Sequence, residues 1–297
     1  MDSLTQITLG AAVGELVLGR KAGNRAMLWG AVGGTLPDLD VVANLATDQL
    51  GALAYHRAIS HSFTFAVIAP LALGWLVHHL YEQRARSPWW GKLALTWLLL
   101  SALLLVGAFV LPIETGGAIR TGLGVGMAMV LPAILIGWRE RRRQSPCHHA
   151  NPSWKAWSWL FFWAIFTHPL LDCCTTYGTQ VLQPFDDYRA AFNNISVVDP
   201  IYTLPFLICV LVTTRLVRNS PRRRFVNLLG IGLSSAYLLL TFFHKDRVND
   251  VFESSLREQG IAYERYMTAP TILNNVLWQG IAETDSSYHY GLYSLFD

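Results

Sequence analysis

The sequence predicts an all-α, polytopic membrane bundle with about six long spans, a short N-terminal helical hairpin and a small C-terminal extramembrane domain. Composition is the main reason: 52% of the 297 residues are apolar, the mean hydropathy is +0.32, and only 14% are charged. Soluble domains contain about 25% charged residues, so this chain has too few charges to cover a surface in water. The shortage excludes an ordinary soluble enzyme, a disordered chain and a nucleic-acid-binding protein with a continuous basic face.

Eight apolar stretches define the predicted helices. A bilayer core of about 30 Å requires about 20 apolar residues in a helix, or fewer where polar ends line a cavity. Six runs that lack Asp, Glu, Lys and Arg are the predicted long spans: residues 58–81, 93–113, 121–138, 156–171, 201–214 and 225–243. Two shorter, glycine-rich stretches at 4–19 and 26–36 precede them and predict the hairpin.

Small residues in the predicted hairpin would let its two helices pack closely. They are Gly10, Ala11, Ala12, Gly14, Gly30, Ala31, Gly33 and Gly34. Glu15 lies in the same stretch, where a buried carboxylate without a partner would be costly. We expect it to form a structural ion pair with Arg20, Lys21 or Arg25.

The basic residues predict the orientation in the membrane. Sixteen of the 23 Lys and Arg residues lie at 20–25, 82–92, 139–155 and 215–224, and alternating spans bring these segments to one side. Because cytoplasmic loops are enriched in Lys and Arg, that side is predicted to be cytoplasmic. We therefore expect a multi-pass protein of a bacterial-type inner membrane, with the other loops and the C-terminus facing the periplasm.

The chain is predicted to divide after residue 244. Residues 1–244 are the membrane-embedded domain. Residues 245–297 include 12 charged residues among 53 and are rich in tyrosine. This composition predicts a small polar domain on the periplasmic side.

Ionisable residues gather at three predicted span ends. The segments are TLPDLD at 35–40, HRAISHS at 56–62 and THPLLD at 167–172. Ionisable groups in membrane segments are costly and are therefore functional candidates. The predicted topology brings all three segments to the outer membrane face.

The chemistry of these residues predicts a metal site. His168 and Asp172 are four residues apart, so both side chains lie on one helix face. His56 and His61 are five apart, so at least one of them comes from the loop before the helix. The six candidate ligands are Asp38, Asp40, His56, His61, His168 and Asp172. Three histidines and three aspartates suit zinc or another first-row divalent cation, as one ion or two.

Each pattern has a simpler interpretation when it is taken alone. A membrane histidine is commonly a hydrogen-bonding residue between helices, and an aspartate after a proline is commonly a helix cap. The convergence of six ligand-type side chains at one predicted depth favours the metal site.

Four further residues are candidates for contact with a substrate. Arg57 lies between two candidate ligands, and its planar guanidinium suits a phosphate or a carboxylate; the alternative role is an interfacial anchor. Tyr177 and Gln180 lie in the polar loop after the fourth span, and Gln6 lies at the outer end of the first short helix. Their side chains are predicted to hydrogen-bond the substrate.

Several of these segments resemble the YdjM-type family of inner-membrane metal-dependent hydrolases. They are MDSLTQ at 1–6, LPDLD at 36–40, HRAISHS at 56–62, HPLLDCCTTYGTQVLQPF at 168–185 and DPIYTLP at 199–205. The resemblance covers most of residues 1–245 and extends into the tail.

This resemblance implies a distant similarity to zinc-dependent phospholipase C, an α-helical phosphodiesterase whose metals are held by His and Asp. The ligand roles that it implies fall on Asp38 or Asp40, on His56 or His61, and on the pair His168 and Asp172. Many family members have Thr-His where this chain has Thr5-Gln6. This departure implies that the protein binds fewer metals or fills that place with water.

Two hypotheses about function follow. The first is a membrane-embedded metal-dependent hydrolase that cleaves a phosphoester in a lipid or lipid-linked substrate with a metal-activated water at the outer membrane face. Asp40 is then the candidate base, and Arg57 neutralises the charge of the substrate. The alternative is a non-catalytic protein: a metal-binding or transport module, or a scaffold whose C-terminal domain docks a partner. A hydrolase requires an open metal position, whereas a structural site has four closed ligands.

Overall fold

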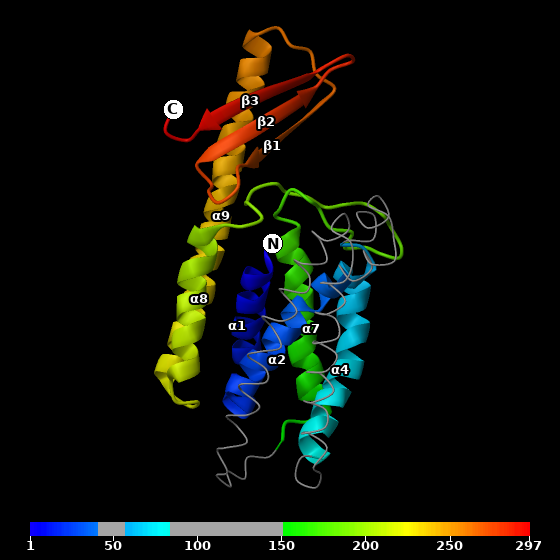
Figure 1. The fold of residues 1–297 in the computed structure, drawn as a ribbon, viewed down its shortest axis with the longest axis vertical. Coiled ribbons are helices and arrows are strands. Elements are labelled where there is room, and N and C mark those ends of the chain that lie inside the picture. The colour runs from blue at the N-terminus through cyan, green and yellow to red at the C-terminus, as the bar shows by residue number, and fades with distance from the viewer. Residues whose placement is uncertain (41–56, 84–150) are drawn as a thin grey trace, which may run out of the picture.

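The computed structural model describes residues 1–40, 57–83 and 151–297 (Figure 1). The helices in this part are α1 (Ser3–Ala22), α2 (Asn24–Thr35), α4 (Phe63–Gln83), α7 (Trp154–Asp172), α8 (Pro200–Arg215) and α9 (Pro221–Glu258). A 3-10 turn, η2 (Ile59–His61), precedes α4. The predicted spans 93–113 and 121–138, and the candidate ligand His56, lie outside the described residues.

Helices α1 and α2 form the predicted N-terminal hairpin. Gly23 makes the turn between them with a φ of 60°, a conformation that glycine adopts without steric cost. The two helices approach to backbone contact. A methyl group added at Gly14 would lie 2.1 Å from the carbonyl oxygen of Ala26, and one added at Gly10 would lie 2.3 Å from that of Gly30. The prediction that small residues permit close packing here is confirmed.

The substitution Gly14→Ala should destabilise the bundle, because the new methyl group meets rigid backbone rather than a movable side chain. Overpacking of this kind costs about 1–3 kcal/mol. Thermal unfolding in detergent, followed by size exclusion, measures the effect. Gly232→Ala on α9 is the matched control, since nothing lies within 4 Å of its added methyl group. An equal melting temperature for the two variants would contradict the account of the hairpin.

Helix α7 is the centre of the bundle. The hairpin packs against one side of α7, and α4 packs against another. Trp157, Leu160 and Phe161 of α7 are fully buried in the resulting core. Helices α8 and α9 pack on each other and on α1, with Ala12 and Phe206 in a second core. The last turn of α7 is thereby held among α1, α2 and the start of α4 (Figure 1).

Two described helices are long and apolar enough to cross a membrane, judged by length and composition: Phe63–Tyr81 of α4, and α9. The predicted spans 156–171 and 201–214 do form helices α7 and α8, but α8 is short and α7 does not meet the same criterion. The prediction of about six long spans is therefore reduced to two within the described residues. Helix α7 packs Trp157, Leu160 and Phe161 against neighbouring helices, while its Trp159 remains 55% exposed.

Glu15 does form a buried ion pair, but its predicted partners within the hairpin are wrong. Arg223 of α9 donates from Nε to Glu15 Oε1 over 2.7 Å and from Nη2 to Oε2 over 2.6 Å. Arg223 is 2% exposed and also donates to Asn24 Oδ1 over 2.8 Å. Spacing within one hairpin cannot reveal a partner that is 208 residues away.

The C-terminal part corrects the all-α prediction. It contains an antiparallel sheet in the order β1-β2-β3, formed by β1 (Arg265–Pro270), β2 (Leu277–Glu283) and β3 (Tyr288–Ser294). Trp278, Gly280 and Ala282 of β2 are buried, and the residues between them are not. This alternation, together with the many tyrosines, is the usual pattern of a half-buried strand.

The sheet is fixed to the bundle in two ways. Helix α9 continues past the predicted boundary at residue 244, and its Phe252 packs so closely on the sheet that a methyl group added at Gly280 would lie 2.4 Å from its ring. In addition, Asn275 accepts a hydrogen bond from His244 Nδ1 over 2.7 Å and donates one to the carbonyl of Asn194 over 2.8 Å. The sheet therefore stands beyond the same end of the bundle as the end of α7 (Figure 1).

Candidate metal centre

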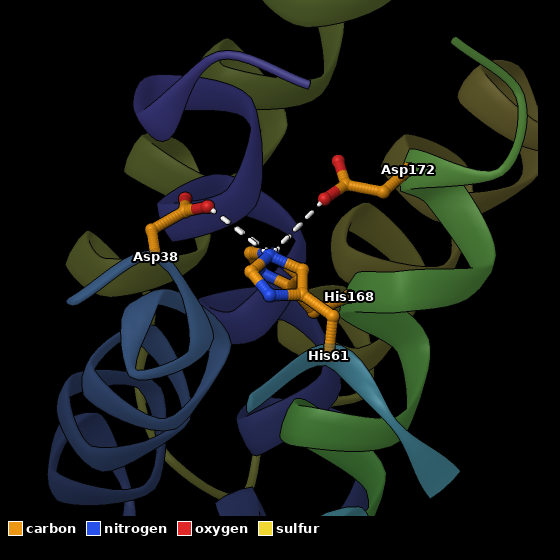
Figure 2. Close-up of side chains that lie close together, drawn as sticks. All are labelled: Asp38, His61, His168 and Asp172. Carbon is orange, nitrogen blue, oxygen red and sulfur yellow. Dashed lines mark ion pairs between the residues drawn. The ribbon is translucent and has the colours of Figure 1, made fainter. Parts of the chain in front are cut away.

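Three segments that are distant in the sequence bring four side chains to one point. Asp38 lies in a short 3-10 turn at 37–40 that follows α2, His61 ends η2, and His168 and Asp172 lie one turn apart at the end of α7. The side chains of His61, His168 and Asp172 are fully buried, and that of Asp38 is 17% exposed. Figure 2 shows that all four point toward one another.

The separations within this group fit a shared cation. His61 Nε2 lies 3.5 Å from Asp38 Oδ1 and 3.4 Å from Asp172 Oδ2. His168 Nε2 lies 3.4 Å and 3.3 Å from the same two oxygens. These distances exceed the usual range of an N–H···O hydrogen bond. By contrast, two ligands on a tetrahedral zinc ion with bonds of about 2.0–2.1 Å lie about 3.3–3.4 Å apart. One ligand atom from each of the four residues lies within 4.8 Å of the other three.

Two inward atoms of the site form no hydrogen bond within the described part of the chain. His168 Nε2 and Asp172 Oδ2 are buried and form no hydrogen bond with any described residue, although buried polar atoms are rarely unpaired. The outward atoms are fixed. His168 Nδ1 donates to the carbonyl of Gly34 over 2.5 Å, and Asp172 Oδ1 accepts from Gln6 Nε2 over 3.0 Å and from the α-amino group of Met1. Such bonds orient metal ligands, and the residues present therefore fit a divalent cation.

Asp40 lies behind His61 and outside the group of four. Its Oδ2 is 3.3 Å from His61 Nδ1, and it accepts hydrogen bonds from Ser60 Oγ over 3.0 Å and from the backbone N–H of Arg57 over 2.9 Å. A carboxylate on the outer nitrogen of a ligating histidine fixes the ring and raises its basicity. The geometry gives Asp40 a positioning contact, where the sequence predicted a metal ligand and a base.

Protons and a cation compete for the site. Burial alone would lower the pKa of His61, but the nearby carboxylates of Asp172, Asp38 and Asp40 raise this pKa to about 10. Burial likewise opposes the ionisation of Asp38, yet His168 and His61 hold the pKa of its carboxyl well below its usual range. Since a histidine must lose its proton to ligate a metal, the binding of a cation here releases protons.

Arg57 lies directly beside the group of four and is 4% exposed. Its φ of 61° is unusual for a residue other than glycine and is a source of local strain. Its carbonyl accepts a hydrogen bond from the backbone N–H of Gln180 over 3.1 Å, which helps to hold this conformation. Its guanidinium Nε lies 3.5 Å from Asp172 Oδ2, and Nη1 donates to Thr175 Oγ1 over 2.8 Å. The strained backbone thus aims a fixed positive charge at the centre.

The three other predicted substrate residues lie in different places. Tyr177 is 57% exposed, and its ring centroid is 5.2 Å from the guanidinium carbon of Arg57. The side chain of Gln180 donates to the carbonyl of Asp187 within its own loop, over 3.0 Å. Gln6 is fully buried behind Asp172. Only Tyr177 therefore lies against the guanidinium of Arg57; Gln6 and Gln180 act on the site through other residues.

Four contributors to the site were missed in the sequence. They are the α-amino group of Met1, the carbonyl of Gly34, the hydroxyl of Ser60, and the hydroxyl of Thr175, which also donates to the carbonyl of Asp172 over 2.8 Å. A main-chain acceptor leaves no signal in a sequence. Ser60 was visible as a polar residue beside His61, and Thr175 as part of the polar loop after α7.

The comparison with known families identifies the family of the chain. A family model described as YdjM inner membrane protein matches residues 1–109 and 122–248, and this range includes all four residues of the centre. The chain belongs to the YdjM inner membrane protein family. The match ends before β1, so the sheet of this YdjM family member lies beyond the shared region. No curated protein and no solved structure matches the chain.

The substitution Asp40→Asn should weaken metal binding about 10–100-fold without removing a ligand, because the carboxylate no longer supports the ring of His61. Competition with a chelator in detergent measures the dissociation constant for zinc. His168→Ala should abolish stoichiometric binding. Asp246→Asn, at an exposed aspartate of α9, is the matched control. An affinity in Asp40→Asn equal to that of the control would remove Asp40 from the site.

Proposed function

We propose that this YdjM family member is a metal-dependent hydrolase embedded in the inner membrane, and that it cleaves a phosphoester in a lipid or lipid-linked substrate. The observation that supports this most is the position of Arg57, whose Nε lies 3.5 Å from an inward oxygen of the candidate metal centre. A fixed guanidinium next to a divalent cation suits the negative charge of a phosphoryl group.

Zinc is the proposed metal, and Asp38, His61, His168 and Asp172 would hold one ion. When bound, a divalent cation supplies a Lewis acid and makes a nucleophile available from water at neutral pH. Residues of the chain would bind the substrate and hold the ligands in position. Arg57 binds and neutralises the phosphoryl oxygens, Tyr177 supports the guanidinium by a cation–π contact, and Asp40 and Gln6 hold His61 and Asp172 in position.

The substrate would approach on the side of Asp38. Its side chain is 17% exposed, whereas those of His61, His168 and Asp172 are fully buried. We assign this end of the bundle to the periplasmic side, because basic residues end α1 and α8 at the opposite end and Lys and Arg mark the cytoplasmic side. A lipid in the outer leaflet would then meet the site laterally.

One feature favours a second function, a structural or transport metal site without catalysis. Four protein ligands are enough to fill a tetrahedral shell, as in closed structural zinc sites. Cobalt substitution discriminates the two possibilities. A hydrolase predicts a visible spectrum that changes when phosphate or a phosphonate is added, since a position is open; a closed site predicts a four-coordinate spectrum that does not respond.

Hydrolysis itself is tested with zinc-loaded protein in nanodiscs that contain a panel of phospholipids, with products followed by phosphorus NMR. We expect Arg57→Ala to lower kcat/KM about 100-fold or more while the metal content stays at the wild-type level, because Arg57 is not a ligand. His168→Ala should lose both metal and activity.

Arg247→Ala, at an exposed arginine of α9, is the control and should keep full activity. Turnover by His168→Ala equal to that of the wild type would show that the observed hydrolysis comes from another source. Loss of metal in Arg57→Ala would show that Arg57 serves to position the ligand Asp172, and would contradict its proposed role toward the substrate.

A further inference from the structure

The loop that follows the metal centre exposes large apolar side chains. It lies between α7 and α8, and an antiparallel bridge between Thr179 and Ala190 closes it into a compact tip. Three residues of this tip have high exposed fractions: 47% for Leu182, 87% for Phe185 and 67% for Tyr188. Exposing side chains of this kind together in water is unfavourable, and an apolar or interfacial environment would bury them.

Internal hydrogen bonds give the tip a defined shape. Gln183 Nε2 donates to Asp187 Oδ1, and the backbone N–H of Tyr188 donates to Asp186 Oδ1 over 2.8 Å. The backbone N–H of Phe185 donates to the carbonyl of Leu182 over 2.9 Å. One oxygen of each aspartate holds a turn, both aspartates remain exposed, and the apolar side chains are presented on a preformed surface.

The level of this tip relative to the membrane follows from one backbone contact. The N–H of Phe63 donates to the carbonyl of Val181 over 2.9 Å, and Phe63 is the first residue of a segment that can span a membrane. The side of α4 below it is exposed and apolar, with Val67 at 56% and Ile68 at 63%. In Figure 1 the segment between α7 and α8 passes over the end of α4. The tip thus continues the lipid-facing surface of α4 at the boundary of the bilayer.

We propose that this tip, residues 181–188, inserts into the interfacial layer of the membrane at the metal-centre end of the bundle. The partner is the lipid surface itself. Phenylalanine, leucine and tyrosine suit a layer that is apolar on one side and wet on the other. The surface is defined by Leu182, Phe185 and Tyr188.

This surface lies beside the centre as well as beside the lipid. The backbone N–H of Gln180, one residue before the tip, donates to the carbonyl of Arg57 over 3.1 Å. Insertion of the tip would therefore hold Arg57 at the depth of lipid headgroups. The inference goes beyond the proposed hydrolysis, since an inserted tip would serve any ligand that reaches the site from the bilayer.

The test is the depth of the tip in nanodiscs of phosphatidylethanolamine and phosphatidylglycerol. Phe185→Cys is labelled with an environment-sensitive fluorophore, and Tyr288→Cys on the exposed face of β3, at a residue that is 71% exposed, is the matched control. Unsubstituted protein treated in parallel measures the label on native cysteines. A nitroxide on a shallow acyl carbon should quench the label in Phe185→Cys at least twofold more than in the control, since inserted residues lie about 5–10 Å within the interface.

Equal quenching and water-like emission at both positions would overturn the proposal and leave the tip as a surface for a soluble partner. Leu182→Cys provides an independent second position, which should show the same depth, so that a folding defect in one variant does not decide the outcome. The readout involves no turnover. A failure of the hydrolysis assay would therefore leave this inference standing, and a failure here would leave the metal centre untouched.

Discussion

The buried carboxylate of Asp172 is the interaction on which the rest of the site depends. It is fully buried, and a buried charge is tolerated only where it is paired and hydrogen-bonded. One oxygen accepts from Gln6 and the α-amino group of Met1, and the other faces His61 and His168 at 3.3–3.4 Å. The first oxygen is satisfied by protein groups. The second also lies 3.5 Å from Arg57 Nε and faces the point that the other three candidate ligands share.

The close packing of the hairpin brings polar groups from two helices to that carboxylate and to its neighbour His168. The glycines of the hairpin let α1 and α2 approach to backbone contact, which brings Gln6 from one helix and the carbonyl of Gly34 from the other against the end of α7. The far end of the same hairpin is fastened by Glu15 and Arg223. The bundle thus has one polar layer around Glu15 and Arg223 and another around the metal centre, with apolar helix segments between them.

The sequence predicted the glycine-rich hairpin and the shared face of His168 and Asp172, because local spacing encodes both. It predicted the convergence of three distant segments from the alternation of the expected spans and from the cost of charge near a membrane. Spacing could not decide which carboxylate of the 37–40 turn faces inward: Asp38 does, and Asp40 supports His61 instead. The partner of Glu15 lies 208 residues away, and no periodicity reports such a contact.

The C-terminal sheet was missed for a different reason. Its β2 strand has the alternating burial of a half-buried strand, with Trp278 and Ala282 facing inward, but the charge content of residues 245–297 indicated only a polar domain. The composition of the chain as a whole also favoured helices throughout. In a short polar segment, the alternation of apolar and polar residues predicts a strand better than overall composition does, because such a strand needs only one buried face.

The central claim is that one cation is bound by four residues: Asp38, His61, His168 and Asp172. X-ray absorption spectroscopy of the zinc-loaded protein in detergent tests this claim most directly. The account predicts a first shell of nitrogen and oxygen at about 2.0–2.1 Å, with outer scattering from two imidazoles that falls to one in His61→Ala. A shell containing sulfur at about 2.3 Å, from the nearby Cys173 and Cys174, would contradict it. So would a spectrum that His61→Ala leaves unchanged.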